Sequence, residues 1–224
     1  MKEELTSHIM RKCHPKSLLA ENVDESIPAF TVAISDTSKN YCVGLVDIVN
    51  STKITSKLPQ NKLASYYEIF LNSMANILNK FGGVAIKNIG DSLLFYFPES
   101  SHPKRKFGFL SCLECTLAMV EEHEKIKDVL KNEGLPSVDY RVSVDYGSIS
   151  FMKSANTSID IFGTPVNMSV KINRQAPVNG IIIGGDMYRL VKDFDEYYFK
   201  EAEGFSIGLK QTYSIYSVRR KSVD

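Results

Sequence analysis

The stretch Ala85-Ile86-Lys87-Asn88-Ile89-Gly90-Asp91-Ser92-Leu93-Leu94-Phe95-Tyr96-Phe97 decides the fold of this chain. Two runs that are typical of β-strands flank the pair Gly90-Asp91, and both residues of that pair tolerate the positive φ angle of a tight hairpin turn. The stretch therefore predicts a β-hairpin. A lysine and an aspartate so close to a turn are compatible with a purely geometric role, and they become informative only beside polar residues elsewhere in the chain.

The length and composition limit the classes of protein to which this chain can belong. The chain has 224 residues, of which 43% are hydrophobic, and this is enough for one main domain with its own core. Its 27 basic and 26 acidic residues leave a formal net charge of +1, so we expect no nucleic-acid partner and no membrane surface held by bulk charge. The apolar runs fall far short of the roughly 20 residues of a spanning helix, and the N-terminus lacks a signal-peptide core. These features predict a soluble, cytoplasmic protein.

The pattern along the chain separates an N-terminal extension from a main domain. Residues 1–38 mix charged and apolar residues, contain Pro15 and Pro28, and end in the turn-like stretch 35–38. We predict that this extension is helical or loosely ordered. Residues 39–224 contain the periodic segments and form the predicted main domain.

The periodic segments alternate between strand and helix patterns. Residues 41–49 form a nearly continuous apolar run, as in a strand covered on both faces. Helical spacing follows from Leu63 to Leu78 and again over residues 105–132, on either side of the hairpin, and a strand alternates over residues 138–144 before Tyr146-Gly147 turns. This order predicts an α+β fold with a ferredoxin-like βαββαβ core. A helix at 165–176, a strand at 180–183, a helix at 185–192 and a C-terminal hairpin ending at 213–218 extend the core.

Two carboxylates are expected to meet in this fold. Asp47 ends the first strand and Asp91 lies in the hairpin after the second, and the first and third strands of a βαββαβ sheet are neighbours. Buried acids are costly unless a charge compensates them, and a hard divalent cation with nucleotide phosphates is a common compensation. The alternative is that each aspartate merely caps a turn. Asn50-Ser51-Thr52, after the first strand, either caps the next helix or offers backbone donors to an anion.

Three motifs carry a resemblance to a known family: Val46-Asp47-Ile48-Val49-Asn50-Ser51-Thr52, Lys87-Asn88-Ile89-Gly90-Asp91 and Asp160-Ile161-Phe162-Gly163-Thr164-Pro165-Val166-Asn167. In order and separation they resemble the successive signatures of the class III nucleotidyl cyclase catalytic domain, and the similarity extends over roughly residues 41–218. Each motif alone is a weak signal, whereas three in register are specific. The resemblance implies the fold of these domains and, for the adenylate type, conversion of ATP to 3′,5′-cyclic AMP and pyrophosphate.

The resemblance also implies a site with two Mg²⁺ or Mn²⁺ ions. Asp47, Asp91 and the main-chain carbonyl of Ile48 match the positions that hold the metals in the family. One ion would lower the pKa of the ribose 3′-hydroxyl, which attacks the α-phosphorus, and the other would bind the leaving phosphates. The triphosphate contacts implied by the family fall on the backbone amides of Asn50, Ser51 and Thr52 and on the side chain of Lys210.

Lys87 and Asp160 match the two positions that recognise the purine in the family. A lysine donates to adenine N1 and an aspartate accepts from the exocyclic amine, so the pair favours ATP over GTP, whose edge offers the opposite pattern. Taken singly, Lys87 is equally compatible with a solvated strand lysine, and Asp160 with a loop residue that caps the next helix.

The catalytic positions implied by the family lie on the helix at 165–176. Asn167 matches the asparagine that orients the ribose, and its alternative role is packing or capping within that helix. The family usually places an arginine four residues later, aimed at the phosphates in the transition state, and here that position is Lys171. Lysine keeps the charge but loses the bidentate geometry. Arg174, one turn beyond, is the alternative source of that charge.

In the family, the metal ligands come from one subunit and the base-recognising residues from the other. Because this chain has both sets, the resemblance implies a homodimer with two interfacial sites for ATP. Two other functions stay open: a cyclase of GTP or of a pyrimidine nucleotide, and a nucleotide-binding module whose catalysis has decayed. The presence of Asp47 and Asp91 favours an enzyme, and Lys171 in place of the arginine favours the decayed module.

Overall fold

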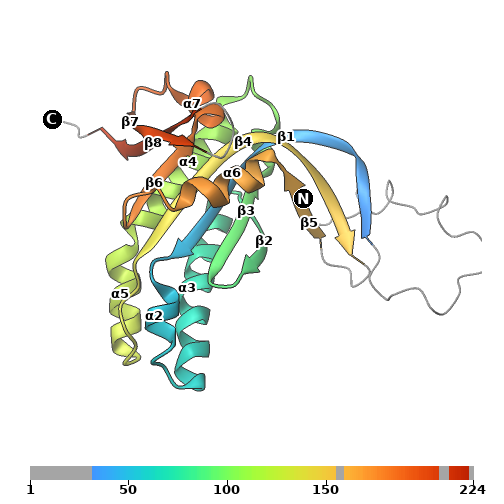
Figure 1. Cartoon of the computed structure of the whole chain (residues 1–224). Helices are drawn as coiled ribbons and strands as arrows, with labels where there is room; N and C mark the ends of the chain where they lie inside the picture. Colours follow the sequence, from blue (N-terminus) through green and yellow to red (C-terminus); the bar gives the residue numbers. More distant parts are fainter. Residues whose placement is uncertain (1–31, 155–158, 207–211, 222–224) are drawn as a thin grey trace, which may run out of the picture.

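The computed structural model describes residues 32–154, 159–206 and 212–221 as a mixed α+β structure (Figure 1). The first elements are β1 (Val32–Ile48), α2 (Ser51–Thr55), α3 (Gln60–Lys80), β2 (Val84–Ile89), β3 (Ser92–Phe97), η1 (Pro98–Ser101), α4 (Lys106–Glu121), α5 (His123–Asn132) and β4 (Tyr140–Ser154). They are followed by β5 (Ile159–Gly163), α6 (Thr164–Asn173), β6 (Gly180–Gly184), α7 (Gly185–Val191), β7 (Tyr197–Ser206) and β8 (Thr212–Arg220). Most of the predicted extension, up to residue 31, lies outside the described residues.

The described strands form one eight-stranded sheet. Its order is β2-β3-β1-β4-β6-β8-β7, and β5 pairs with β4. β1 is central and runs antiparallel to both β3 and β4. The elements from β1 to β4 follow the predicted βαββαβ order, so the predicted α+β core is confirmed. The turn between β2 and β3 is the predicted two-residue turn, in which Gly90 has a φ of 62°.

The first strand is longer than the sequence pattern predicted. β1 begins at Val32, so residues 32–38 are part of a strand rather than a loose connector. They pair with the end of β4, across a register shift between Ile34 and Ser38. The turn-like composition of residues 35–38 therefore produces an irregularity within a strand and does not end it.

The predicted turn at Tyr146-Gly147 is wrong, because β4 runs straight through it. Gly147 serves packing there, since an added Cβ would lie only 3.2 Å from the Pro165 ring. The long helix predicted over residues 105–132 is divided into α4 and α5. In the described part of the chain, none of the helices combines the length and the apolar character needed to cross a bilayer.

The central strand distributes its side chains between two layers. The even-numbered positions pack against α3, α4 and α5 in the larger core cluster, and they are Cys42, Val46 and Ile48. The odd-numbered positions belong to the opposite face, and they are Tyr41, Val43 and Leu45. In Figure 1, α6 crosses the sheet in front of β1 and β4, whereas α3 and α5 lie behind it. Asp47, an odd-numbered residue, therefore belongs to the face that α6 covers.

α6 is attached to the sheet by buried hydrogen bonds as well as by apolar contacts. The Ser169 hydroxyl donates to the Val43 carbonyl oxygen at 2.8 Å. The Ser143 hydroxyl on β4 donates to the Ser169 carbonyl oxygen at 2.8 Å. Asn173 Nδ2 donates to Ser143 Oγ at 3.1 Å and to the Leu45 carbonyl oxygen at 3.3 Å. Because hydrogen bonds are directional, this network fixes how α6 is oriented on β1 and β4.

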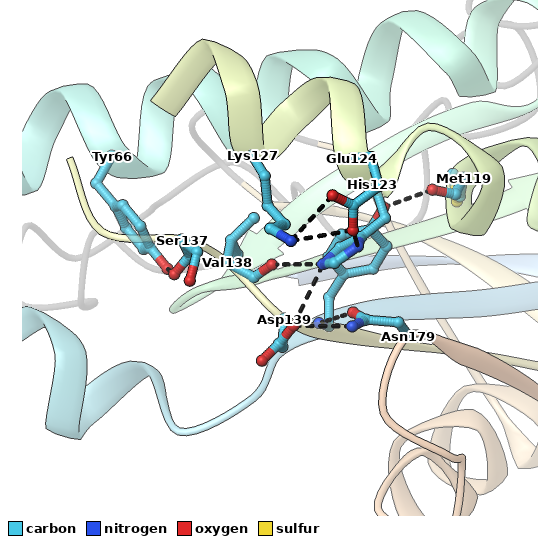
Figure 2. Close-up of polar contacts among 10 residues, drawn as sticks. Tyr66, Met119, His123, Glu124, Lys127, Ser137, Val138, Asp139 and Asn179 are labelled. Atoms are coloured by element: carbon cyan, nitrogen blue, oxygen red, sulfur yellow. Dashed lines mark hydrogen bonds and ion pairs between the residues drawn. The ribbon is translucent and has the colours of Figure 1, made fainter. Parts of the chain in front are cut away.

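A second polar cluster closes the end of the sheet at which β1 stops and β4 starts (Figure 2). Asn179 has a φ of 54°, accepts a hydrogen bond from the Tyr140 N–H at 3.0 Å and donates to Asp139 Oδ1 at 2.8 Å. His123 Nε2 lies 2.9 Å from the Val138 carbonyl oxygen. These contacts tie α5 and the segment before β6 to the first residue of β4, which pairs with the last residue of β1.

The buried carboxylate of Asp145 lies where β4, α7 and β8 meet. Asp145 is 1% exposed. The Tyr213 hydroxyl lies 2.8 Å from Asp145 Oδ2 and 3.2 Å from Asp186 Oδ2, and it accepts a hydrogen bond from the Asp186 N–H at 3.1 Å. Burial raises the pKa of Asp145 to about 7, and the hydrogen bond from Tyr213 only partly offsets this rise. Asp145 therefore changes charge near neutral pH.

We expect Asn173→Ala to lower the free energy of unfolding by about 2 kcal/mol, because it removes buried hydrogen bonds from α6 to β1 and β4. Urea unfolding measures this change. Val170→Ala is the matched control on the same helix, since Val170 is 43% exposed, and we expect a change within about 0.5 kcal/mol. Equal effects of the two substitutions would contradict the anchoring role of Asn173.

We expect Asp145→Asn to remove much of the pH dependence of stability between pH 5 and pH 8. The folded state holds the Asp145 proton more tightly than the unfolded state, so this stabilisation is complete below the ordinary aspartate pKa of 3.8 and is lost as the pH rises to about 7. At pH 8 the variant should be more stable than the natural chain by on the order of 3 kcal/mol. Urea unfolding at both pH values measures the two stabilities, and Asp128→Asn, at an exposed position on α5, is the control. Parallel pH profiles of Asp145→Asn and the natural chain would refute it.

Candidate active site

Asp47 and Asp91 are brought together by the pairing of β1 with β3. Val46 pairs with Leu93, which places Asp47 opposite Ser92. The Ser92 hydroxyl donates a hydrogen bond to Asp47 Oδ1. Asp91 immediately precedes Ser92 in the hairpin turn, so both carboxylates lie at the same end of the two central strands.

The surroundings of Asp47 contain some groups that disfavour its ionised carboxylate and others that favour it. Burial raises the pKa of the half-buried Asp47 carboxyl, and the charge of Asp91 raises it further. The hydrogen bond from Ser92 and the positive charges of Arg141 and Arg174 lower the pKa. Two neighbouring carboxylates repel each other, and a cation between them would relieve that repulsion.

A pocket of about 160 Å³ lies beside Asp47. Its walls come from β1, β2, β3 and α6, and the lining residues are Leu45, Asp47, Ile89, Ser92, Val170, Asn173 and Arg174. Asn173 Oδ1 is buried and has no hydrogen-bond partner among the described residues. The pocket therefore connects the strand end that carries Asp47 to the helix that carries the predicted catalytic residues.

The donor set at this end of the sheet fits a hard divalent cation. The available side-chain donors are carboxylate oxygens, and the described residues contain no group of three or more His, Cys, Asp or Glu side chains that would form a self-sufficient metal site. Magnesium is commonly held by one or two carboxylates together with substrate phosphates. The predicted third donor, the Ile48 carbonyl, lies at the last residue of β1. The residues present therefore fit a metal ion that is completed by a bound nucleotide.

Lys87 and Asp160, 73 residues apart in the chain, form an ion pair in which the Lys87 ammonium donates to Asp160 Oδ2. β2 carries Lys87 just after a register shift, and β5 carries Asp160. The side chains are 44% and 21% exposed, so the pair stays accessible to a ligand. Asp160 lies within a strand, so its expected alternative as a loop residue is wrong. Its second oxygen, Oδ1, accepts from the Ile161 N–H at 2.8 Å.

The predicted catalytic residues lie on the exposed face of α6. Asn167 and Lys171 are one helical turn apart and exposed, and Arg174 caps the C-terminal end of the helix. The opposite face of α6 is buried through residues that include Met168 and Ile172. Arg174 lines the pocket of its own Asp47, whereas Asn167 and Lys171 do not. The structure therefore separates Arg174 from the other two residues.

The structure describes three of the four residues predicted to contact the triphosphate. Asn50 follows β1 with a φ of 56°, and its side chain makes no capping hydrogen bond to α2, so the expected capping alternative is wrong for Asn50. Ser51 and Thr52 form the start of α2, directly after the strand end that carries Asp47. Lys210 lies outside the described residues.

Sequence reasoning missed Ser92 and Asn173 as parts of this site. A signal for Ser92 existed, because the register of a βαββαβ sheet places the first residue of the third strand opposite the end of the first. Asn173 interrupts the buried face of α6 with a polar side chain, and such a residue needs hydrogen-bond partners. Only the sheet geometry shows that these partners lie on β1 and β4.

The comparison with known sequences identifies a family. The family described as "Adenylate and Guanylate cyclase catalytic domain" matches residues 34–219. The chain is 23% identical over 145 residues to an adenylate cyclase of Streptomyces coelicolor, which covers 65% of this chain and 32% of that protein. It is 26% identical over 149 residues to a cytidylate cyclase of Staphylococcus aureus, with 64% and 35% covered. The chain spans about a third of the length of these curated relatives.

Solved structures share the fold. The adenylyl cyclase CyaB from P. aeruginosa superposes with a TM-score of 0.73 at 20% identity, over 83% of this chain and 96% of that chain. The guanylate cyclase domain of RhGC from Catenaria anguillulae, in complex with GTP, gives a TM-score of 0.72 at 17% identity, over 83% and 100%. With the family match over most of its length, the chain belongs to the adenylate and guanylate cyclase catalytic domain family, the class III nucleotidyl cyclases.

Proposed function

We propose that residues 39–224 form an adenylate cyclase domain that converts ATP to 3′,5′-cyclic AMP and pyrophosphate. The observation that carries this proposal is the ion pair of Lys87 with Asp160, which joins a donor and an acceptor suited to the adenine edge in a member of a cyclase family. ATP is an intracellular nucleotide, so the proposed location is the cytoplasm.

In the proposed reaction, the ribose 3′-oxygen forms a bond to the α-phosphorus, the bond to the pyrophosphate oxygen breaks, and the hydroxyl proton leaves to solvent. Asp47, Asp91 and the Ile48 carbonyl would hold Mg²⁺ or Mn²⁺, two ions per site, which supply activation of the hydroxyl and charge for the leaving phosphates. The Ser92 hydroxyl orients Asp47 toward this position. The amides of Asn50, Ser51 and Thr52, with Lys210, would bind the triphosphate.

We propose that the site is completed by a second copy of the chain. Asn167 and Lys171 are exposed and do not line the Asp47 pocket of their own chain, so they are available to a nucleotide held by a partner. In this arrangement Asn167 orients the ribose and Lys171 supplies the positive charge at the phosphates. Arg174 is the weaker candidate for that charge, because it lies in the pocket of its own Asp47 and stabilises that carboxylate.

Lys87 and Asp160 would select the base by complementary hydrogen bonds. The lysine donates to adenine N1 and the aspartate accepts from the 6-amino group. Guanine presents a donor at N1 and an acceptor at position 6. The Lys87 donor would then face a donor, and the Asp160 acceptor would face an acceptor. Rejection by unsatisfied polar groups is strong in a site built for hydrogen bonding.

A second candidate is a cytidylate cyclase. Cytosine presents an acceptor at N3 and an amine at position 4, which is the same pattern that adenine presents to Lys87 and Asp160. The relative from Staphylococcus aureus, 26% identical over 149 residues, is named as a cytidylate cyclase. The hydrogen bonds of this pair therefore favour ATP and CTP over GTP and UTP.

Product identity tests the proposal. The purified protein is incubated separately with ATP, GTP, CTP and UTP, with magnesium and then with manganese, and the products are resolved by mass. We expect cyclic AMP to exceed the other products. Asp91→Asn removes one carboxylate charge and preserves side-chain shape, and it should lower turnover by at least about 100-fold without changing the melting temperature.

Each outcome of this experiment has a defined meaning. Cyclic CMP above cyclic AMP would select the second candidate. Substantial turnover by the Asp91→Asn variant would exclude the metal role of Asp91. No cyclic product from any nucleotide, in protein shown to be dimeric and to bind ATP with metal, would select a decayed binding module.

A charge swap tests base selection. Lys87→Glu combined with Asp160→Lys keeps the ion pair and reverses the hydrogen-bond pattern, so we expect the ratio of kcat/KM for ATP over GTP to fall by at least about tenfold. Steady-state kinetics with both nucleotides measures this ratio. The matched control is Lys127→Glu combined with Glu124→Lys, which reverses an exposed ion pair on α5. An unchanged ratio in the first double variant would remove Lys87 and Asp160 from base selection.

A further inference from the structure

The Tyr213 hydroxyl on β8 lies between two carboxylates. Its oxygen is 2.8 Å from Asp145 Oδ2 on β4 and 3.2 Å from Asp186 Oδ2 on α7. The Asp186 N–H donates to the same oxygen at 3.1 Å, so the hydroxyl has one proton to donate and one lone pair left to accept. One proton cannot serve two ionised carboxylates. All hydrogen bonds of this group are therefore satisfied only when one of the two acids is protonated.

The surroundings of the two acids decide that Asp145 holds the proton. Asp145 is 1% exposed, and burial raises its pKa to about 7. The Asp186 side chain is 37% exposed and forms an ion pair with Arg189, which stabilises its ionised form. The negative charge of Asp186 also raises the pKa of Asp145. Protonation of the group therefore takes place on Asp145, while Asp186 stays ionised.

The other neighbours of Asp145 carry no charge. Its strand partner on β1 is Val43, and the residues that α6 buries toward the sheet are uncharged. On β6, Gly184 leaves room for the acid, because a Cβ at this position would collide with the Asp145 carboxylate. Among the described residues, the groups that respond to the proton are thus Tyr213 on β8 and Asp186 on α7, with the ion-paired Arg189.

The group lies between elements that are joined to the sheet in different ways. The Met187 N–H, in the first turn of α7, donates to Asp145, and Tyr213 is the second residue of β8. Val43, opposite Asp145, precedes Asp47 by four residues on β1, so Asp145 is about 13 Å away from the candidate metal ligands. A change of charge at Asp145 therefore acts on the attachment of α7 and β8, without direct contact with those ligands.

We propose that Asp145, Tyr213 and Asp186 form a proton-dependent switch that controls how α7 is attached to β8. With Asp145 protonated, its O–H donates to the Tyr213 oxygen, and the Tyr213 hydroxyl donates to Asp186. When the proton leaves to solvent, the Tyr213 hydroxyl donates to the Asp145 carboxylate instead. Asp186 then loses its donor, is repelled by the second negative charge and turns toward solvent with Arg189. The proposal does not depend on the nucleotide that the active site uses.

Carboxyl ¹³C NMR of the full chain, labelled at aspartate, tests the switch in the folded protein. We expect the signals of Asp145 and Asp186 to shift with a common midpoint near pH 7, because the proton on one acid decides the hydrogen bond of the other. Asp145→Asn and Asp186→Asn assign the two signals. In Asp145→Asn the side-chain amide donates to Tyr213 as the protonated acid does, so the Asp186 signal should no longer shift near pH 7. An Asp186 signal that stays constant while Asp145 titrates would overturn the proposal.

A double-mutant cycle measures the bond that the switch makes and breaks. The coupling between Tyr213→Phe and Asp186→Ala is taken from the equilibrium constants of urea unfolding. We expect it to be about tenfold at pH 5.5 and less than about twofold at pH 8.5. In the Asp145→Asn background we expect about tenfold at both pH values.

A second tyrosine–carboxylate pair provides the matched control. The Tyr197 hydroxyl donates to Glu114. Partial burial raises the pKa of Glu114, but the hydrogen bonds from Arg220 and Tyr197 outweigh this effect and the pKa is lowered. Glu114 therefore stays ionised at both pH values, and the coupling between Tyr197→Phe and Glu114→Ala should be the same at both.

Two results of the cycle would refute the switch. A coupling between Tyr213 and Asp186 that is equal at pH 5.5 and pH 8.5 would mean that the proton on Asp145 does not control this bond. A coupling that still depends on pH in the Asp145→Asn background would place the responsible proton on another group. If a variant does not fold at pH 8.5, the NMR titration of the natural chain decides, because it needs no substitution in the protein under test.

Discussion

The antiparallel pairing of β1 with β3 is the constraint on which the candidate site depends. Because side chains alternate along a strand, the register that pairs Val46 with Leu93 also decides that Asp47 faces α6 and lies opposite Ser92. A shift of one residue would turn Asp47 into the apolar layer of α3, α4 and α5, where a carboxylate would be far more costly. The register is fixed in turn by the apolar residues that alternate on both faces of β1. The pairing of β1 with β3 therefore determines both which apolar residues of β1 are buried on each face and where Asp47 lies.

The two faces of the sheet are stabilised in different ways. The face toward α3, α4 and α5 is almost entirely apolar, which favours burial strongly but sets orientation weakly. The face toward α6 includes the buried polar residues Ser143, Ser169 and Asn173, and the hydrogen bonds observed between them and the two strands require one orientation of the helix. If α6 presents Asn167 and Lys171 to a ligand, as proposed, a directional attachment would hold these two residues in place. The polar face thus sets the orientation of α6 relative to β1 and β4.

The parts of the fold that were predictable from the sequence are those determined by local pattern. The hairpin at Gly90-Asp91 and the βαββαβ order follow from turn chemistry and from the period of the apolar residues. Gly147 gave a turn signal, but its lack of a side chain serves the packing of Pro165, which lies on another element. Residues 32–38 gave no strand pattern, because their pairing depends on the far end of β4. The proximity of Lys87 and Asp160 came from resemblance to a family, since no local signal links residues 73 apart.

If Lys87 and Asp160 contact the base, as proposed, their ion pair limits which nucleotides the site can discriminate. The two charges satisfy each other, so under the proposed function a base has to offer hydrogen bonds to both groups without separating them far. In this proposal, a base with a donor opposite Lys87 or an acceptor opposite Asp160 would leave a charge without a partner and would be rejected strongly. Adenine and cytosine both avoid that penalty, so hydrogen bonding at this pair cannot separate them. The choice between them has to come from the space around the base, where a purine buries a second ring that a pyrimidine lacks.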